Sequence, residues 1–125
     1  SPLASVLVDA LKVAGSSGPL LINLANISVI KAEGDYSRII KDHGASHLIR
    51  RTLVAWVNQL AYASFFRVDR FTLINLVHVV SYHRTSRDHA QLRLKGMKEP
   101  VRLGRRAILR LDQEFKARPP QFWLG

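Results

Sequence analysis

The chain has 125 residues, enough for one domain with its own hydrophobic core and too few for two domains of ordinary size. Its sequence contains no cysteine, which excludes a disulfide scaffold, thiolate zinc sites and thiol catalysis. Nineteen Lys and Arg residues face nine Asp and Glu residues, and the formal net charge of +10 favours nucleic acid, an anionic membrane surface or an acidic protein as the partner.

The first half of the sequence predicts one helix followed by short strands. Apolar residues at near-helical spacing favour a helix over residues 2–14, and the Gly15-Ser16-Ser17-Gly18 string that follows is typical of a flexible linker. Apolar and β-branched runs between turn signals then predict strands at residues 20–24, 27–32, 36–41 and 46–51, the last two as a hairpin.

The second half predicts a short helix, more strands and a terminal helix. Thr52 precedes apolar residues at helical spacing, which indicates a helix N-cap and a helix over residues 53–62. A terminal helix is expected at 105–117, with Ile108, Leu111 and Phe115 buried. Strands are expected at residues 65–69, 71–74, 77–83, 90–95 and 99–103. Antiparallel hairpins dominate this order and no internal repeat is evident, so we predict a mainly β protein with an N-terminal and a C-terminal helix.

The sequence offers no signature of catalysis, metal binding or membrane insertion. It has no nucleophile elbow, no phosphate-cradling glycine loop and no paired carboxylates in register, so no enzymatic activity and no cofactor is expected. The five histidines lack the spacing of metal ligands. No apolar run reaches the roughly 18 residues of a membrane span, and residues 1–14 lack the pattern of a signal peptide.

Three segments, in order and at matching spacing, resemble the LytTR family of bacterial DNA-binding domains. They are IxxIKAEGDYSRI (Ile27 to Ile39), FFRVDRFTLINLVHV (Phe65 to Val79) and LGRRAILRL (Leu103 to Leu111). The resemblance implies an elongated set of small antiparallel sheets. It places the DNA-binding domain at residues 19–118, with an N-terminal helix and linker at 1–18 and a tail at 119–125.

The resemblance also implies a function. A LytTR-like domain would be the cytoplasmic output domain of a bacterial transcription regulator, such as a response regulator in two-component signalling. It would bind double-stranded DNA sequence-specifically through loops in successive major grooves, as a homodimer on paired repeats, downstream of a sensor or receiver domain. The alternative is a basic protein-interaction or dimerisation module without sequence-specific DNA binding. RNA binding is less favoured, because no RRM or KH motif is present.

Carried over residue by residue, the resemblance names three loop positions for DNA contact. The first lies in the segment Tyr36-Ser37-Arg38, with Ser37 as the expected contact. The second is Arg70, and the third is Arg105. An arginine at such a place suits a bidentate contact with the guanine edge. Asp69 departs from the family, which commonly has His there, and its carboxylate could hold a neighbouring arginine instead.

Other basic residues are candidates from the residue pattern. Arg106 follows Arg105 at the predicted start of the last helix, where a helix N-terminus attracts anions such as phosphate. Lys41 and Arg93 are candidates for phosphate contacts, which position a protein on DNA without reading its sequence. For each of these residues the competing interpretation is ordinary solvated surface.

Overall fold

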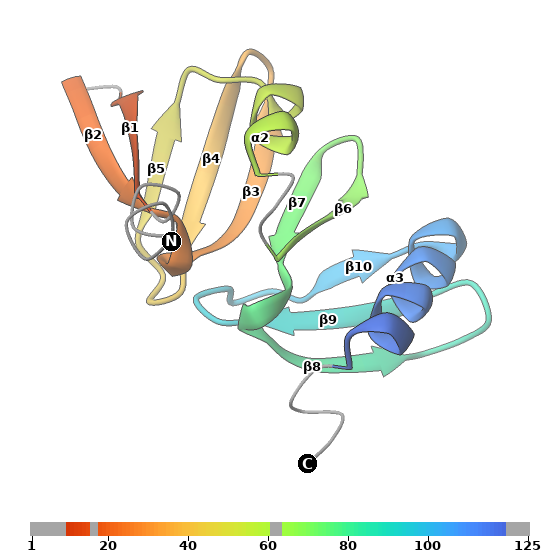
Figure 1. Ribbon diagram of the computed structural model, residues 1–125. Coiled ribbons are helices and arrows are strands. Elements are labelled where there is room, and N and C mark those ends of the chain that lie inside the picture. The colour runs from red at the N-terminus through yellow and green to blue at the C-terminus, as the bar shows by residue number, and fades with distance from the viewer. Residues whose placement is uncertain (1–9, 16–17, 61–63, 120–125) are drawn as a thin grey trace.

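The computed structural model describes residues 10–15, 18–60 and 64–119, which form two antiparallel sheets and two α-helices (Figure 1). The larger sheet has the strand order β2-β1-β5-β4-β3-β7-β6 and the smaller has the order β10-β9-β8. The strands are β1 Ala10–Gly15, β2 Gly18–Asn23, β3 Ile27–Glu33, β4 Tyr36–Lys41, β5 Ser46–Ile49, β6 Phe65–Asp69, β7 Thr72–Asn75, β8 Val79–Arg84, β9 Ala90–Leu94 and β10 Val101–Leu103. The helices are α2 Leu53–Gln59 and α3 Arg105–Ala117, with short 3₁₀ helices η1 Leu24–Asn26 and η2 Leu76–His78. The predicted mainly β architecture is confirmed.

The N-terminal helix predicted over residues 2–14 is wrong for the part that the structure describes. Residues 10–15 form strand β1, which pairs antiparallel with β2, and Gly15 lies opposite Gly18. Leu11 and Val13 are two residues apart and therefore fit a strand as well as a helix. The neighbouring strand satisfies the backbone of β1. Of the predicted linker, Gly15 and Gly18 are the paired ends of β1 and β2, and residues 16–17 lie outside the described residues. Residues 1–9 of the predicted helix lie outside the described residues.

Helix α2 covers one face of the larger sheet. The hydroxyl of Thr52 accepts a 3.3 Å hydrogen bond from the Ala55 backbone N–H, which confirms the predicted N-cap. Trp56 is fully buried on the inner face of the helix. The core at this interface comprises Ile22, Leu24, Ile27, Ile30, Ile39, Ile49, Leu53, Trp56, Leu60 and Leu73. The predicted helix over 53–62 is thus confirmed for 53–59.

A second core joins the smaller sheet to α3 and to the edge of the larger sheet. The predicted inward residues of α3, namely Ile108, Leu111 and Phe115, are buried there. Strand β9 alternates as predicted, with Leu92 buried and Arg93 exposed. Val29 and Ile74 of the larger sheet belong to the same core. This shared core fixes the position of α3 relative to β6 and β7.

Two corners of the fold are built from the same four residues, although no repeat was expected. The string Leu-Ile-Asn-Leu occurs at 21–24 and again at 73–76, each time at the end of a strand. The Asn23 side chain caps η1 by accepting a 3.1 Å hydrogen bond from Ala25 N–H. Asn75 caps η2 in the same way, accepting at 3.3 Å from Val77 N–H. A four-residue string is too short to reveal such a corner by sequence inspection.

The two corners contact each other. The Asn75 amide donates a 2.9 Å hydrogen bond to the carbonyl oxygen of Ile27, just after η1. The ring Nε2 of His78 donates to the carbonyl oxygen of Ala25 at 2.5 Å. These bonds join the start of β3 to the crossing between the two sheets, so they fix how the smaller sheet is attached to the larger one.

Candidate nucleic-acid interface

Three exposed segments lie along one border of the molecule, and we call them the three turns. From the top to the right of Figure 1 they are the β3–β4 turn, the β6–β7 turn and the start of α3. The Ala32 N–H, at the end of β3, donates a 2.8 Å hydrogen bond to the Phe71 carbonyl and so joins the first turn to the second. Arg110 of α3 donates to the carbonyl oxygens of Arg67 and Val68, both at 2.8 Å, and joins the helix to β6.

Arg70 occupies the tip of the β6–β7 turn, where its side chain is exposed. The Asp69 carboxylate accepts a 2.8 Å hydrogen bond from Phe71 N–H, which closes the turn. Arg67 donates to the carbonyl oxygens of Asp69 at 3.1 Å and of Arg70 at 3.4 Å. The backbone that carries Arg70 is therefore held from both sides.

The Arg70 guanidinium is available for an external acceptor. It forms no hydrogen bond or ion pair with the described residues, and lies 5.9 Å from the centroid of the exposed Phe71 ring. The expectation that the Asp69 carboxylate holds a neighbouring arginine is wrong in this structure, because that carboxylate binds the backbone of its own turn.

Arg105 and Arg106 are exposed at the start of α3. Gly104 is the N-cap and supplies no side-chain hydrogen bond, and the first turn contains no acidic residue. The first N–H groups of an uncapped helix attract an anion, and the two guanidinium groups add positive charge at the same place. Arg105 lies 3.5 Å from an Asp88 carboxylate oxygen, whereas Arg106 has no polar partner among the described residues.

Ser37 was predicted to contact DNA, but the structure places it in the interior. It is completely buried, and its hydroxyl donates a hydrogen bond to the Arg51 carbonyl. Successive residues of a strand face opposite sides of the sheet. In β4, Ser37 and Ile39 lie on the buried side, toward the core under α2. In this structure Ser37 cannot reach DNA. Tyr36, one residue earlier in the segment that the resemblance names, is exposed beside the turn.

The remaining predicted residues lie away from the three turns or are already paired. Arg38 is half-buried and donates a 2.5 Å hydrogen bond to Glu33 on the neighbouring strand, so its guanidinium already has a partner within the domain. Lys41 is at the opposite end of β4 from Tyr36, about 17 Å away at the usual rise per residue. Arg93 lies exposed on the outer face of the smaller sheet. Phosphate contacts by Lys41 and Arg93 stay predictions.

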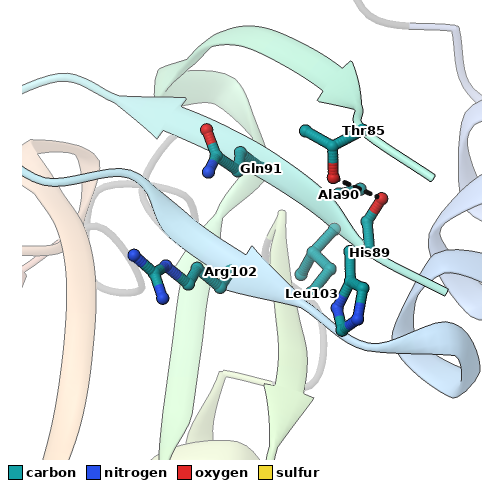
Figure 2. A pocket seen from close by; sticks show the side chains of 6 residues that line it. All are labelled: Thr85, His89, Ala90, Gln91, Arg102 and Leu103. Carbon is teal, nitrogen blue, oxygen red and sulfur yellow. Dashed lines mark hydrogen bonds between the residues drawn. The ribbon is translucent and has the colours of Figure 1, made fainter.

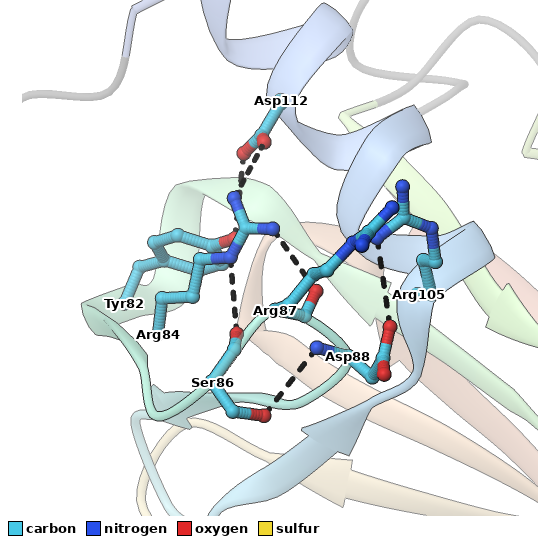
Figure 3. A network of polar contacts seen from close by, with 7 residues as sticks. All are labelled: Tyr82, Arg84, Ser86, Arg87, Asp88, Arg105 and Asp112. Carbon is cyan, nitrogen blue, oxygen red and sulfur yellow. Dashed lines mark hydrogen bonds and ion pairs between the residues drawn. The ribbon is translucent and has the colours of Figure 1, made fainter.

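A network that the sequence did not reveal joins the β8–β9 loop to α3 (Figure 3). Arg84 donates to the carbonyl oxygens of Ser86 at 3.1 Å and of Arg87 at 3.0 Å, and lies 4.0 Å from the Asp112 carboxylate. The Tyr82 hydroxyl donates to the same carboxylate at 3.3 Å. Burial, followed by the Asp112 charge, raises the pKa of Tyr82, so the phenol remains a neutral donor.

The smaller sheet also carries a pocket of about 190 Å³ (Figure 2). It is lined by Thr85, His89, Ala90, Gln91, Arg102 and Leu103. Sites for small molecules commonly have about 300–1,000 Å³ and a mainly apolar lining. This pocket is smaller and carries an exposed guanidinium, that of Arg102, on its wall. Its lining mixes polar and apolar groups, and the pocket is open rather than an enclosed binding site.

Within residues 10–15, 18–60 and 64–119, no group of three or more His, Asp and Glu side chains is placed to hold a metal ion. The helices in the described part of the chain are too short or too polar to cross a membrane.

Comparison with known proteins identifies the fold and the family. The structure is similar to the solved LytTr DNA-binding domain of a protein from Bacillus cereus, with a TM-score of 0.71 and 12% sequence identity, covering 84% of this chain and 94% of that one. Curated protein sequences give no match. The sequence profile of the LytTr DNA-binding domain matches residues 18–116, most of the chain. The chain therefore belongs to the family of LytTr DNA-binding domains.

Proposed function

We propose that this domain binds specific sequences in double-stranded DNA, as the cytoplasmic output domain of a bacterial transcription regulator. The observation that carries the proposal is the presentation of Arg70 at an exposed turn whose backbone is held by hydrogen bonds of 2.8, 3.1 and 3.4 Å. A side chain on a fixed backbone loses less freedom on binding than one on a mobile loop. Arg70 is thus suited to a bidentate contact with guanine N7 and O6 in the major groove.

Arg105 is the second base-reading residue of the proposal. It begins α3, and α3 is hydrogen-bonded to the strand that leads into the Arg70 turn. The two arginines therefore lie on elements that are hydrogen-bonded to each other, and they can enter the DNA together. Arg106 and the N–H groups of the first helical turn are suited to the adjacent phosphates. The net charge of +10 supports attraction to duplex DNA in general.

The wider role follows from the family resemblance. We expect a homodimer on paired sites, with a sensor or receiver domain preceding this domain in the full-length regulator. The proposal assigns no chemical reaction to the domain, whose task is to bind DNA. The competing role is a basic module that meets an acidic protein, and its binding would show no preference among duplex sequences.

The proposal is tested by selection from a pool of randomised duplexes. The selected duplex and a scrambled duplex of equal length are then titrated at two or more salt concentrations. We expect enrichment of a short motif, and an affinity for it at least about a thousandfold above that for the scrambled duplex. Absence of enrichment, with equal salt-sensitive affinity for both duplexes, would overturn the proposal and leave only a basic surface.

A further inference from the structure

The β8–β9 loop is ordered by its own hydrogen bonds. The Thr85 N–H and hydroxyl donate to the His89 carbonyl at 3.0 and 3.2 Å, and the Ser86 N–H donates to the same oxygen at 3.2 Å. Arg84 spans the loop by donating to the carbonyl oxygens of Ser86 and Arg87. The loop therefore has a defined shape without any bound partner.

The same loop is tied to the helix that begins with Arg105. Arg84 lies 4.0 Å from the Asp112 carboxylate on α3, and Tyr82 donates to that carboxylate. Figure 3 shows the loop beneath the helix, with these contacts at one end and Asp88 at the other. The position of Asp88 relative to the start of α3 is fixed by this arrangement.

The Asp88 carboxylate faces the guanidinium of Arg105. The backbone N–H of Asp88 donates to the Ser86 hydroxyl at 3.3 Å, which orients the residue, and its Oδ1 lies 3.5 Å from Nη1 of Arg105. The Asp88 side chain is 62% exposed and the Arg105 side chain is 43% exposed. An ion pair this exposed contributes little to stability, so a change at Asp88 is expected to leave the fold intact.

We propose that Asp88 is a positioning and specificity-determining residue for DNA recognition. Asp88 holds the Arg105 guanidinium in one orientation, so that the remaining N–H donors of Arg105 meet a guanine edge. The negative charge of Asp88 repels phosphates at the same place. Specificity is a difference between affinities, and a repulsive group increases it by weakening the wrong complexes. This inference rests on the proposed function, since it requires that Arg105 reads a base.

The test compares Asp88→Asn with a control that removes the same charge elsewhere. Glu99→Gln is the control, because Glu99 is exposed between β9 and β10 and has no polar partner among the described residues. Affinities are measured for the selected duplex, for the same duplex changed at the base whose recognition Arg105→Ala abolishes, and for a scrambled duplex. Thermal unfolding is followed for each variant to establish that it folds.

The expected result distinguishes the orienting effect of Asp88 on Arg105 from the general effect of removing one negative charge. Asp88→Asn lowers discrimination at the Arg105-dependent base about tenfold and raises affinity for the scrambled duplex about twofold, whereas Glu99→Gln changes all duplexes alike. Asp88→Glu restores much of the discrimination. In an Arg105→Ala background, Asp88→Asn no longer changes discrimination at that base.

Two outcomes overturn the inference while the proposed function stands. One is unchanged discrimination in a folded Asp88→Asn variant. The other is an Arg105→Ala variant that weakens all duplexes equally, because Arg105 then reads no base. If the unaltered domain selects no motif, the proposed function fails first, and the two failures are distinguished by that selection.

Discussion

Arg110 donates a 2.8 Å hydrogen bond to the carbonyl oxygen of Arg67, and Arg67 in turn holds the turn that presents Arg70. The terminal helix and the second exposed turn are thereby connected through two guanidinium groups. The Arg110 guanidinium also lies 5.1 Å from the centroid of the Phe66 ring. The placement of Arg70 consequently depends on a residue in α3 that has no expected contact with DNA.

Replacement of Arg110 by lysine tests this connection. Lysine keeps the charge but lacks the planar fork that reaches both the Arg67 and Val68 carbonyls, so we expect a loss of about 1 kcal/mol in the free energy of unfolding. Chemical denaturation measures this loss. Arg106→Lys is the matched control, expected to stay within about 0.5 kcal/mol, because Arg106 is exposed and has no polar partner among the described residues. Equal effects of the two changes would contradict the structural role of Arg110.

Arg70→Ala is expected to weaken the selected duplex far more than a scrambled duplex. The loss of one bidentate guanine contact corresponds to about 1–3 kcal/mol of discrimination, read from titrations with both duplexes. Arg93→Ala is the comparison, since Arg93 is also exposed but lies on the face of a regular strand. It should weaken both duplexes alike and reduce the salt slope by about one. Equal losses on both duplexes for Arg70→Ala would make Arg70 a phosphate contact.

Local sequence patterns predicted most of the elements because the responsible interactions are local. The cap at Thr52, the alternation around Leu92 and the helical spacing from Ile108 to Phe115 each decide the structure within a few residues. The helix prediction failed over residues 10–15 because the spacing of Leu11 and Val13 fits both a helix and a strand. Pairing with β2 decided in favour of the strand. Such pairing is a property of the whole fold rather than of the segment.

The candidate site was only partly predictable for the same reason. The family resemblance located the turns that present Arg70 and Arg105. It placed Ser37 on the wrong side of its strand, because a shift of one residue exchanges the two faces of a sheet. The pair formed by Asp88 and Arg105 joins residues seventeen positions apart through the packing of a loop on a helix, and no single-sequence pattern encodes that contact.

The repeated corner gives a matched test of a buried polar side chain. Asn75 is buried, donates to the Ile27 carbonyl at 2.9 Å and accepts from Ser64 at 2.6 Å, whereas Asn23 makes one exposed capping bond at 3.1 Å. Asn75→Ala should cost about 3 kcal/mol of unfolding free energy, because it leaves the buried Ile27 carbonyl without this donor. Asn23→Ala should cost about 1 kcal/mol, the usual effect of a lost cap. Similar losses in denaturation experiments would show that Asn75 contributes nothing beyond its cap.

Tyr82 makes stability depend on pH in the alkaline range. Burial and the neighbouring Asp112 raise its pKa in the folded state above the value of about 10 in the unfolded chain. The folded state therefore holds the phenol proton more tightly than the unfolded state does. The stability linked to this proton is fully present below about pH 10 and is lost as the pH rises through the folded-state pKa.

Tyr82→Phe removes this dependence together with the hydrogen bond to Asp112. Near pH 8 the variant should be less stable than the unaltered domain by about 1 kcal/mol, the usual contribution of one hydrogen bond. Between pH 9 and pH 11 the difference should shrink, because only the unaltered domain loses stability through this group. Urea denaturation of both proteins at several pH values measures the difference, and the lysines, which titrate in the same range, affect both proteins equally. A difference that stays constant up to pH 11 would show that the Tyr82 phenol ionises alike in the folded and unfolded chains, and would remove the Asp112 contact as an electrostatic tie between β8 and α3.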